Sequence, residues 1–431
     1  MAEYRGIEYL RRKLNQKRIR VMKRYRFYEM KYQVRDFEIS SPESMRWLSP
    51  VLGWCGKAAD SIADRLVFRE FEDDNFDLNG IFRMNNPDLL FDSAVLSACI
   101  ASCSFIYVSP DETGYPRLQV IDGGNATGII DETAGLLKEG YAVLERDDFQ
   151  NPTLEAWFTP GRTDYQYADG SVRSYPNSAP YPLLVPIILR PDAMRPFGHS
   201  RISRACMNIV SSAVRTVKRS EVTAEFYSFP QKWVVGTSPD AEEMEVPNPE
   251  TQKMEKWKQT ISMLLEFSKD EDGEHPQVGQ FQQQSMAPHT EQLRTFAALF
   301  SGETGLTLDD LGFVSENPAS VEAIRAAHEN LRLTARKAQR SFGSGFLNAG
   351  YLAACVRDDY PYQRRQLYLT KPAWEPIFEP DASMLNLMGD GIIKINQAVP
   401  GYFNLDNMRS ITGIPASSLP APTGENIGGT E

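Results

Sequence analysis

The sequence predicts an α+β protein in which long helices and β-hairpins occupy separate stretches of the chain. Amphipathic periodicity typical of helices extends over about 5–30, 199–228 and 320–355. Between 117 and 190, short segments such as RLQVIDG and GYAVLERD alternate with Gly, Asp, Asn and Pro, as hairpins do. A turn-rich acidic insert separates two of the helical regions. Helices and strands are therefore expected to be segregated along the chain.

The composition is that of an ordinary globular protein. The chain has 431 residues, 42% hydrophobic and 24% charged, which is enough for two or three packed units. The formal net charge of -11 argues against DNA binding over the whole surface, but it does not exclude a local basic surface. No secretion signal and no apolar run of about 18 residues occur, so we expect neither export by that route nor a membrane span. Scattered cysteines favour reduced, buried thiols over a disulfide framework: Cys55, Cys99, Cys103, Cys206 and Cys355.

The first hundred residues are predicted to be mostly helical. Segment 1–35 carries twelve Lys or Arg and three Glu, and a basic helix is expected at about 5–30. An apolar helix at about 50–66 precedes FEDDNFDLNG, a predicted loop. NFDLNG resembles the opening of a calcium loop, but its twelfth position is Asn86 instead of Glu, so a turn is favoured. A buried helix at about 87–103 leads into a strand, SFIYVSP.

The helix predicted at about 199–228 has an apolar and a basic face. At 100° per residue, the apolar side contains Ile202, Cys206, Ile209, Ala213 and Val217. Between Ser200 and Ser220 the chain has five basic residues and no acid. They either form a solvated surface or contact a partner: Arg201, Arg204, Arg215, Lys218 and Arg219.

A shorter helix is predicted at about 289–301 and a long one from 320 to about 355. The long helix carries an apolar stripe, Ile324, Ala327, Leu331, Ala335, Ala338, Phe342 and Phe346. Gly343 and Gly345 predict a kink, because glycine weakens a helix interior by about 1 kcal/mol. A separate basic stripe is formed by Arg325, Arg332, Arg336 and Arg340.

Two polar regions flank the shorter helix. Residues 240–274 contain eleven acids and four lysines around short strands such as KWVVG and VGQFQ, which indicates a surface with a partner of its own. Its candidate docking residues are Glu242, Glu243, Glu245, Asp270, Glu271 and Asp272. The loop before the long helix offers Thr307, Asp309, Asp310, Glu316 and Asn317. The tail after Ile414 is small, polar and rich in Pro and Gly, which predicts disorder.

The sequence contains no signature of an enzyme, a cofactor or a metal site. Phosphate-cradle, dinucleotide, zinc-protease and serine-nucleophile motifs are absent, and the four histidines are far apart in sequence. We therefore expect no catalytic residues, no cofactor and no metal. Two alternatives remain: a metal-dependent nucleic-acid enzyme that uses Asp309 and Asp310, and a cytosolic scaffold or adaptor that forms no ring.

Five segments, in order, resemble the portal proteins of tailed bacteriophages. They are RYRFYEMKYQ, LGWCGKAADSIADRLVFREF, VPIILRPDAMRPFGHSRISRA, FYSFPQKWVVG and FVSENPASVEAIRAAHENLRLTARKAQRSFG. The third is similar to the family's "G-x-S-x-I" approach to its stem. The resemblance covers roughly residues 20–400. Each motif alone is degenerate, whereas their shared order with an acidic insert between two helices is fairly specific.

The resemblance implies a portal fold with wing, helical stem, small α/β clip and helical crown. On this scheme the wing is 1–195, the stem helices are 196–228 and 289–302, and the clip is 229–288. A channel loop at 303–319, a long kinked wing helix at 320–364, a crown at 365–413 and a disordered tail at 414–431 complete it.

The resemblance further implies a ring of twelve subunits at one capsid vertex of the virion, assembled in the host cytoplasm. Its partners would be double-stranded DNA, the large terminase, the major capsid protein, scaffold and a head-completion or adaptor protein, with no membrane. Helices about 10 Å apart give twelve copies a circumference near 120 Å and an opening of roughly 28 Å, enough for a duplex, whereas six leave about 9 Å. The basic face of the 199–228 helix would contact phosphates in the channel or, as we favour, acids of a neighbouring subunit such as Glu221, Glu225 or carboxylates of the wing.

Overall fold

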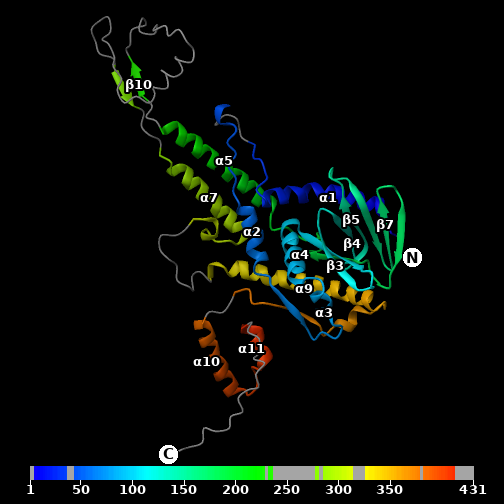
Figure 1. Ribbon diagram of the computed structural model, residues 1–431. Coiled ribbons are helices and arrows are strands. Elements are labelled where there is room, and N and C mark those ends of the chain that lie inside the picture. The colour runs from blue at the N-terminus through cyan, green and yellow to red at the C-terminus, as the bar shows by residue number, and fades with distance from the viewer. Residues whose placement is uncertain are drawn as a thin grey trace, which may run out of the picture.

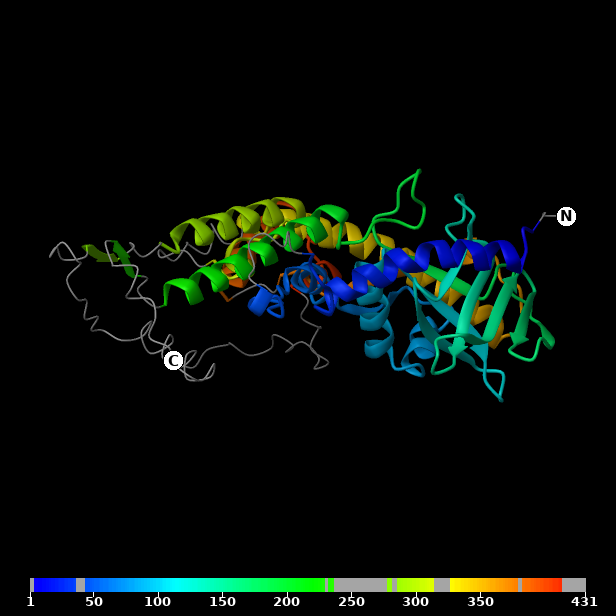
Figure 2. The ribbon, with the colours of Figure 1, turned by 90° about the horizontal axis from the view of Figure 1, so that it is seen from above.

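The computed structural model describes residues 4–35, 43–228, 232–235, 277–280, 285–313, 326–378 and 382–412. Within these residues the chain combines a body of helices and sheets with a helical hairpin that projects from one side of it (Figure 1). Seen from above, the hairpin continues the long dimension of the body (Figure 2). The predicted mixture of helix and sheet is confirmed.

The basic N-terminal helix lies across the body. α1 (Ile7–Tyr28) buries Leu10 and Leu14 against Tyr141 and Val143 of the sheet below. Arg11 donates hydrogen bonds to Glu155 at 3.2 and 2.6 Å, so part of the helix's charge is neutralised by the sheet. The helix predicted at about 5–30 is confirmed with slightly shorter bounds.

The two larger sheets of the body are antiparallel, as the hairpin pattern predicted. One has three strands in the order β3-β2-β9 and the other five in the order β4-β5-β6-β7-β8. The first contains β2 (Cys103–Pro110), β3 (Pro116–Asp122) and β9 (Leu184–Ile188). The second contains β4 (Ala126–Ile130), β5 (Leu137–Arg146), β6 (Pro152–Thr159), β7 (Arg162–Tyr167) and β8 (Val172–Pro176).

The helices α2 (Trp54–Ala63) and α4 (Pro87–Ala101) form the apolar centre as predicted, but the segment between them is not simply a loop. The first residues of the predicted loop 71–80 belong to β1 (Phe68–Glu72), and its last residues belong to α3 (Leu78–Arg83). β1 pairs with β12 (Lys371–Trp374), about 300 residues later, so no local pattern reveals the strand. Between them, the carboxylate of Asp74 accepts backbone bonds from Phe76, Leu78 and Asn79, which confirms the expected turn.

An aromatic cluster joins five elements of the core. Ring centroids lie 4.1 Å apart for Phe68 and Phe91, 4.6 Å for Phe91 and Phe346, and 5.3 Å for Phe68 and Trp374. Phe71 and Phe82 are 5.3 Å apart. Phe346 of α9 (Glu329–Arg357) lies 5.9 Å from Phe68 and 6.1 Å from Trp374 between ring centroids, so the cluster packs α9 against the β1–β12 pair.

The long helix α9 is continuous through Gly343 and Gly345, where a kink was predicted. These glycines permit close packing: a Cβ on Gly343 would lie 2.6 Å from Cγ of Pro372, and one on Gly345 would lie 2.8 Å from Cδ1 of Ile187. Most of the predicted apolar stripe is buried, namely Leu331, Ala335, Ala338, Phe342 and Phe346. Ala327 is exposed, and Ile324 lies outside the described residues.

All five cysteines are free and buried, which confirms the prediction of reduced thiols. Burial raises the pKa of Cys99 to about 12 and that of Cys355 to about 11. These thiols are therefore neutral at physiological pH.

The remaining elements are short or lie at the C-terminal end. The 3-10 turns are η1 (Glu43–Met45), η3 (Asp309–Leu311) and η4 (Arg364–Leu367). α10 (Ala382–Ala398) and α11 (Leu405–Thr412) form a small helical unit. It lies on the opposite side of the chain from the strands β10 (Lys232–Val235) and β11 (Gln277–Gln280) (Figure 1). Of the helices that the structure describes, none has the length and apolar character needed to cross a membrane. The tail predicted to be disordered, 414–431, lies outside the described residues.

Candidate functional site

The projecting hairpin consists of two antiparallel helices, α5 (Arg204–Tyr227) and α7 (Ala287–Thr304). The hydroxyl of Ser203 caps α5 by accepting from the backbone N–H of Cys206 at 3.1 Å. A left-handed Gly305 ends α7. The second helix begins two residues before and ends three residues after the helix predicted at about 289–301, so it is longer than its sequence pattern suggested.

Three side-chain contacts fix the register of the hairpin along its length. Near the body, Ser203 donates to Glu303 at 2.8 Å. Further out, Thr216 donates to Oε1 of Gln292 at 3.0 Å, and Thr223 lies 3.4 Å from Nε2 of His289. The 24 residues of α5 make a rod of about 36 Å.

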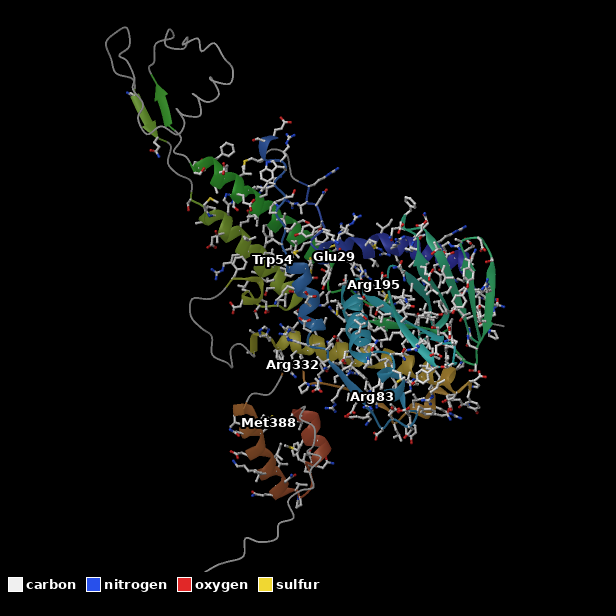
Figure 3. All side chains as sticks on the ribbon, in the orientation of Figure 1. Glu29, Trp54, Arg83, Arg195, Arg332 and Met388 are labelled. Atoms are coloured by element: carbon white, nitrogen blue, oxygen red, sulfur yellow. The ribbon has the colours of Figure 1, made fainter. Side chains whose placement is uncertain are left out.

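Apolar contacts hold the two helices together and to the body. Cys206, Val210, Ala213 and Val214 of α5 are buried, whereas the predicted Ile209 and Val217 are half-buried. On α7, Ala297 and Phe300 are fully buried. Trp54 of α2 lies 5.7 Å from Phe300, ring centroid to centroid, where α2 meets the base of the hairpin (Figure 3).

Arg201 does not belong to the basic face, and this prediction was wrong. The helix begins at Arg204 because Ser203 caps it, so Arg201 precedes it in an irregular segment. Its side chain is 6% exposed and donates to the backbone oxygens of Ala58, at 3.2 Å, and Thr304, at 2.6 Å. Burial lowers the pKa of this guanidinium. Arg201 therefore joins α2 to the end of α7 within one chain.

The other four basic residues do lie on α5. Arg204 is exposed near the base, and Arg215, Lys218 and Arg219 are half-buried further along. Arg215 donates to the hydroxyl of Ser212 at 2.9 Å. The ammonium of Lys218 lies 3.4 Å from the backbone oxygen of Arg46, so a segment of this same chain covers part of the basic face. The acids Glu221 and Glu225 are exposed toward the far end.

A short turn follows the hairpin. The backbone N–H and hydroxyl of Thr307 both donate to Oδ2 of Asp310 at 2.9 Å, and the N–H of Asp310 donates back to that hydroxyl at 3.2 Å. Asp310 thus stabilises the turn η3, whereas Asp309 is exposed. In the part of the chain that the structure describes, no three His, Cys, Asp or Glu side chains are placed to hold a metal ion. Glu316 and Asn317 lie outside it.

Only part of the basic stripe of α9 is exposed to solvent and free of ion pairs with its own helix. Arg332 forms a two-bonded ion pair with Glu329, both contacts being 2.7 Å, whereas Arg336 and Arg340 are exposed. Arg325 lies outside the described residues.

Of the acidic insert, only the strands at its two ends are described. β10 (Lys232–Val235) and β11 (Gln277–Gln280) pair antiparallel, with Val234 opposite Val278, which confirms both predicted strands. The six predicted docking acids all lie outside the described residues: Glu242, Glu243, Glu245, Asp270, Glu271 and Asp272.

Comparison with known proteins finds two curated relatives. The portal protein of Mycobacterium phage L5 is 25% identical over 348 residues, which cover 76% of this chain and 69% of the relative. The portal protein of Mycobacterium phage D29 is 26% identical over 348 residues, with the same coverage of both chains. No protein-family model matches the sequence.

Among solved structures the likeness is distant. A chain from the virion of a native gene transfer agent particle is 14% identical, with a TM-score of 0.43 over 84% of this chain and 90% of that one. A chain from the neck of an empty gene transfer agent particle is 12% identical, with a TM-score of 0.44 over 88% and 96%. It is the two curated relatives that confirm what the motifs indicated: this chain resembles the portal proteins of tailed bacteriophages.

Proposed function

We propose that this chain is a portal subunit, a structural protein without catalytic residues that forms a closed ring at one capsid vertex and surrounds the path of DNA. The α5–α7 hairpin is the observation that carries the proposal. A rod of about 36 Å projecting from a folded body has one face for its own body and others for neighbouring copies. The resemblance to two phage portal proteins supports the same conclusion.

The hairpin is suited to repeat around an axis. Its register is fixed by Ser203, Thr216 and Thr223, so each copy presents the same surface. Exposed apolar side chains remain on both helices, with Leu299 56% and Phe226 48% exposed. Contacts between copies would cover such side chains. With helices about 10 Å apart, about twelve copies are needed for an opening that admits a duplex.

The other regions are assigned on this scheme by position in the chain. The body within 1–195 and the helix within 320–364 form the wing, and 196–228 with 289–302 form the stem. The insert 229–288 is the clip, which docks the large terminase and later head-completion or adaptor proteins. Residues 303–319 form the channel loop and 365–413 the crown. The ring would nucleate capsid assembly with scaffold and the major capsid protein in the host cytoplasm, and then remain in the virion.

The basic face of α5 is assigned to contacts between subunits. Arg204 is exposed at the base, whereas Glu221 and Glu225 are exposed at the far end. Copies in a closed ring are related by rotation alone, so opposite charges of neighbouring copies approach one another when the hairpins are inclined to the ring axis. Dense cations facing the channel would bind phosphates and slow the movement of DNA. On this assignment Arg204→Glu weakens the ring, whereas a channel-facing Arg204 leaves the ring intact and alters only DNA passage.

Negative-stain electron microscopy and native mass spectrometry of the purified full chain test the proposal. Twelve chains of 48.6 kDa give a mass of about 583 kDa. For the unmodified protein we expect rings with a central hole. At the same protein concentration, Arg204→Glu should give assemblies of fewer subunits. Monomers or dimers at every concentration and salt tried would contradict the proposal.

A further inference from the structure

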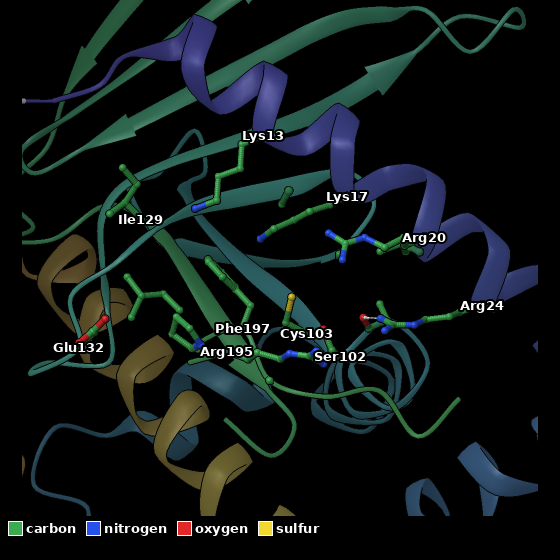
Figure 4. A pocket seen from close by; sticks show the side chains of 17 residues that line it. Lys13, Lys17, Arg20, Arg24, Ser102, Cys103, Ile129, Glu132, Arg195 and Phe197 are labelled. Atoms are coloured by element: carbon green, nitrogen blue, oxygen red, sulfur yellow. Dashed lines mark hydrogen bonds between the residues drawn. The ribbon is translucent and has the colours of Figure 1, made fainter. Parts of the chain in front are cut away.

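A basic cleft lies between α1 and the segment that precedes α5 (Figure 4). Its volume is about 490 Å³. Four cations of α1 reach into it from one side, and Arg195 lies on the other, with Glu132 as the single acidic residue of the lining. The four are Lys13, Lys17, Arg20 and Arg24.

The four residues of α1 are spaced by four, three and four positions, so they share one face of the helix. Among the other basic residues of α1, Arg12 and Lys23 are exposed and lie outside the cleft. The cleft therefore uses one stripe of the basic residues of α1.

Lysine ammonium groups are positioned by an aromatic ring and by a backbone oxygen. Nζ of Lys17 lies 3.8 Å from the ring centroid of Phe197, and Nζ of Lys13 lies 5.2 Å from the same centroid. Lys13 also donates to the backbone oxygen of Gly128 at 2.7 Å. Arg24 donates to the backbone oxygen of Ala101 at 2.6 Å. These contacts hold the cations in place and leave further donors for a ligand.

Negative charge is scarce around these groups. Within the described residues, none of the five cations forms an ion pair with a carboxylate. Burial lowers the pKa of Lys13 to about 8, and it also lowers the pKa of Lys17 and Arg24. The thiol of Cys103 in the lining is neutral, because burial raises its pKa. The protein therefore holds five cations around one cleft whose lining contains a single carboxylate, that of Glu132, in a chain of formal net charge -11.

We propose that this cleft binds a phosphate group. A phosphate dianion carries several acceptor oxygens around one centre, so it can accept from Lys13, Lys17 and an arginine at once, whereas a single carboxylate has two oxygens. Arginine forks and lysine ammonium groups are the usual protein partners of phosphate. The group comes either from a free phosphate or from the backbone of duplex DNA. This proposal is independent of ring formation.

Binding of inorganic phosphate to the full-length protein, measured by isothermal titration calorimetry, is the first arm of the test. The double variant Lys13→Gln with Lys17→Gln removes two cations from the cleft. Arg12→Gln with Lys23→Gln removes the same charge from exposed positions of the same helix. We expect the cleft variant to weaken binding at least about tenfold, because hydrogen bonds to charged groups are stronger than neutral ones. The control should bind within about twofold of the unmodified protein.

The second arm uses a 20-base-pair duplex in fluorescence anisotropy at several salt concentrations. Tighter binding to the unmodified protein than to the cleft variant, with a smaller salt dependence in the variant, assigns the group to the DNA backbone. Phosphate binding without this difference for the duplex assigns it to a free phosphate.

Two results overturn the proposal. One is equal loss of binding in the cleft variant and the exposed control. The other is that the unmodified protein and the cleft variant bind inorganic phosphate with equal affinity and the duplex with equal affinity, even if they differ in affinity for a poly-glutamate peptide. Circular dichroism confirms that the variants fold. Should the double variant fail to fold, Lys17→Gln alone replaces it, and Lys17→Arg, which keeps the charge, should restore binding.

Discussion

Replacing Arg201 by methionine should loosen the base of the α5–α7 hairpin. The guanidinium is 6% exposed and donates to the backbone oxygens of Ala58 and Thr304. Methionine has similar length but no donor, so the carbonyls of Ala58 and Thr304 each lose a charged donor, while Ser61 still donates to Ala58 at 3.3 Å. Hydrogen bonds to a charged group contribute about 1.5–3 kcal/mol each. Part of this loss is offset, because the variant no longer carries the desolvation cost of a buried guanidinium. The net destabilisation should be about 3–4 kcal/mol.

Hydrogen exchange measured by mass spectrometry locates this loss. Peptides that cover the end of α7 and the middle of α2 should exchange faster in Arg201→Met, by roughly a hundredfold or more for that free-energy change. Peptides of the five-stranded sheet should be unaffected, because Arg201 makes no bond to them.

Arg83→Met is the matched control, since it removes the same group from an exposed position of α3, outside the subunit contacts assigned to Arg204. It should change exchange at these peptides by less than about 0.5 kcal/mol. Equal effects of the two substitutions, or unchanged exchange at α2 and α7 in Arg201→Met, would refute the assignment of Arg201 as the residue that joins these helices.

Three further predictions concern packing, capping and the thiols. Gly343→Ala should lower the free energy of unfolding by about 1–3 kcal/mol in urea denaturation, because its Cβ would meet Pro372 at 2.6 Å. Gly302→Ala, in a helix position with nothing within 4 Å, should instead raise it by about 0.5–1 kcal/mol, and the same sign for both would contradict the packing argument. Ser203→Ala removes the cap of α5 and should cost about 1 kcal/mol in the same assay, while an unchanged urea midpoint would argue against the cap. At pH 8.5 the native protein should react negligibly with a thiol reagent, because burial keeps Cys99 and the other thiols neutral, and five thiols should react after denaturation; rapid labelling of the native chain would show that a thiol is accessible.

Local periodicity predicted the helices well, because their burial repeats every three or four residues. The apolar stripe of α9 from Leu331 to Phe346 is buried as expected. β1 was missed because its pairing partner β12 is about 300 residues away, and a five-residue strand carries little signal of its own. Gly343 and Gly345 were misread for the same reason: the neighbours that require them, Pro372 and Ile187, are distant in sequence.

The predicted site was less complete than the predicted fold. A helical projection placed Arg201 and Arg204 on one face, but a projection assumes a helix, and the cap at Ser203 starts the helix after Arg201. The basic cleft was also missed. Its four helical cations were visible as a stripe from Lys13 to Arg24, but Arg195 and Phe197 come from a segment that only tertiary structure brings alongside.

The bonds of Arg201 also determine where the hairpin can pivot. They attach the ends of α5 and α7 nearest the body to α2, while the opposite ends have no such anchor among the described contacts. A tilt of about 5° at this point would displace the distant end of a rod of about 36 Å by roughly 3 Å. Through the bond from Arg201 to the Ala58 carbonyl, the same tilt would also rotate α2. A force applied at the outer end of the hairpin would therefore displace residues in the apolar centre of the body.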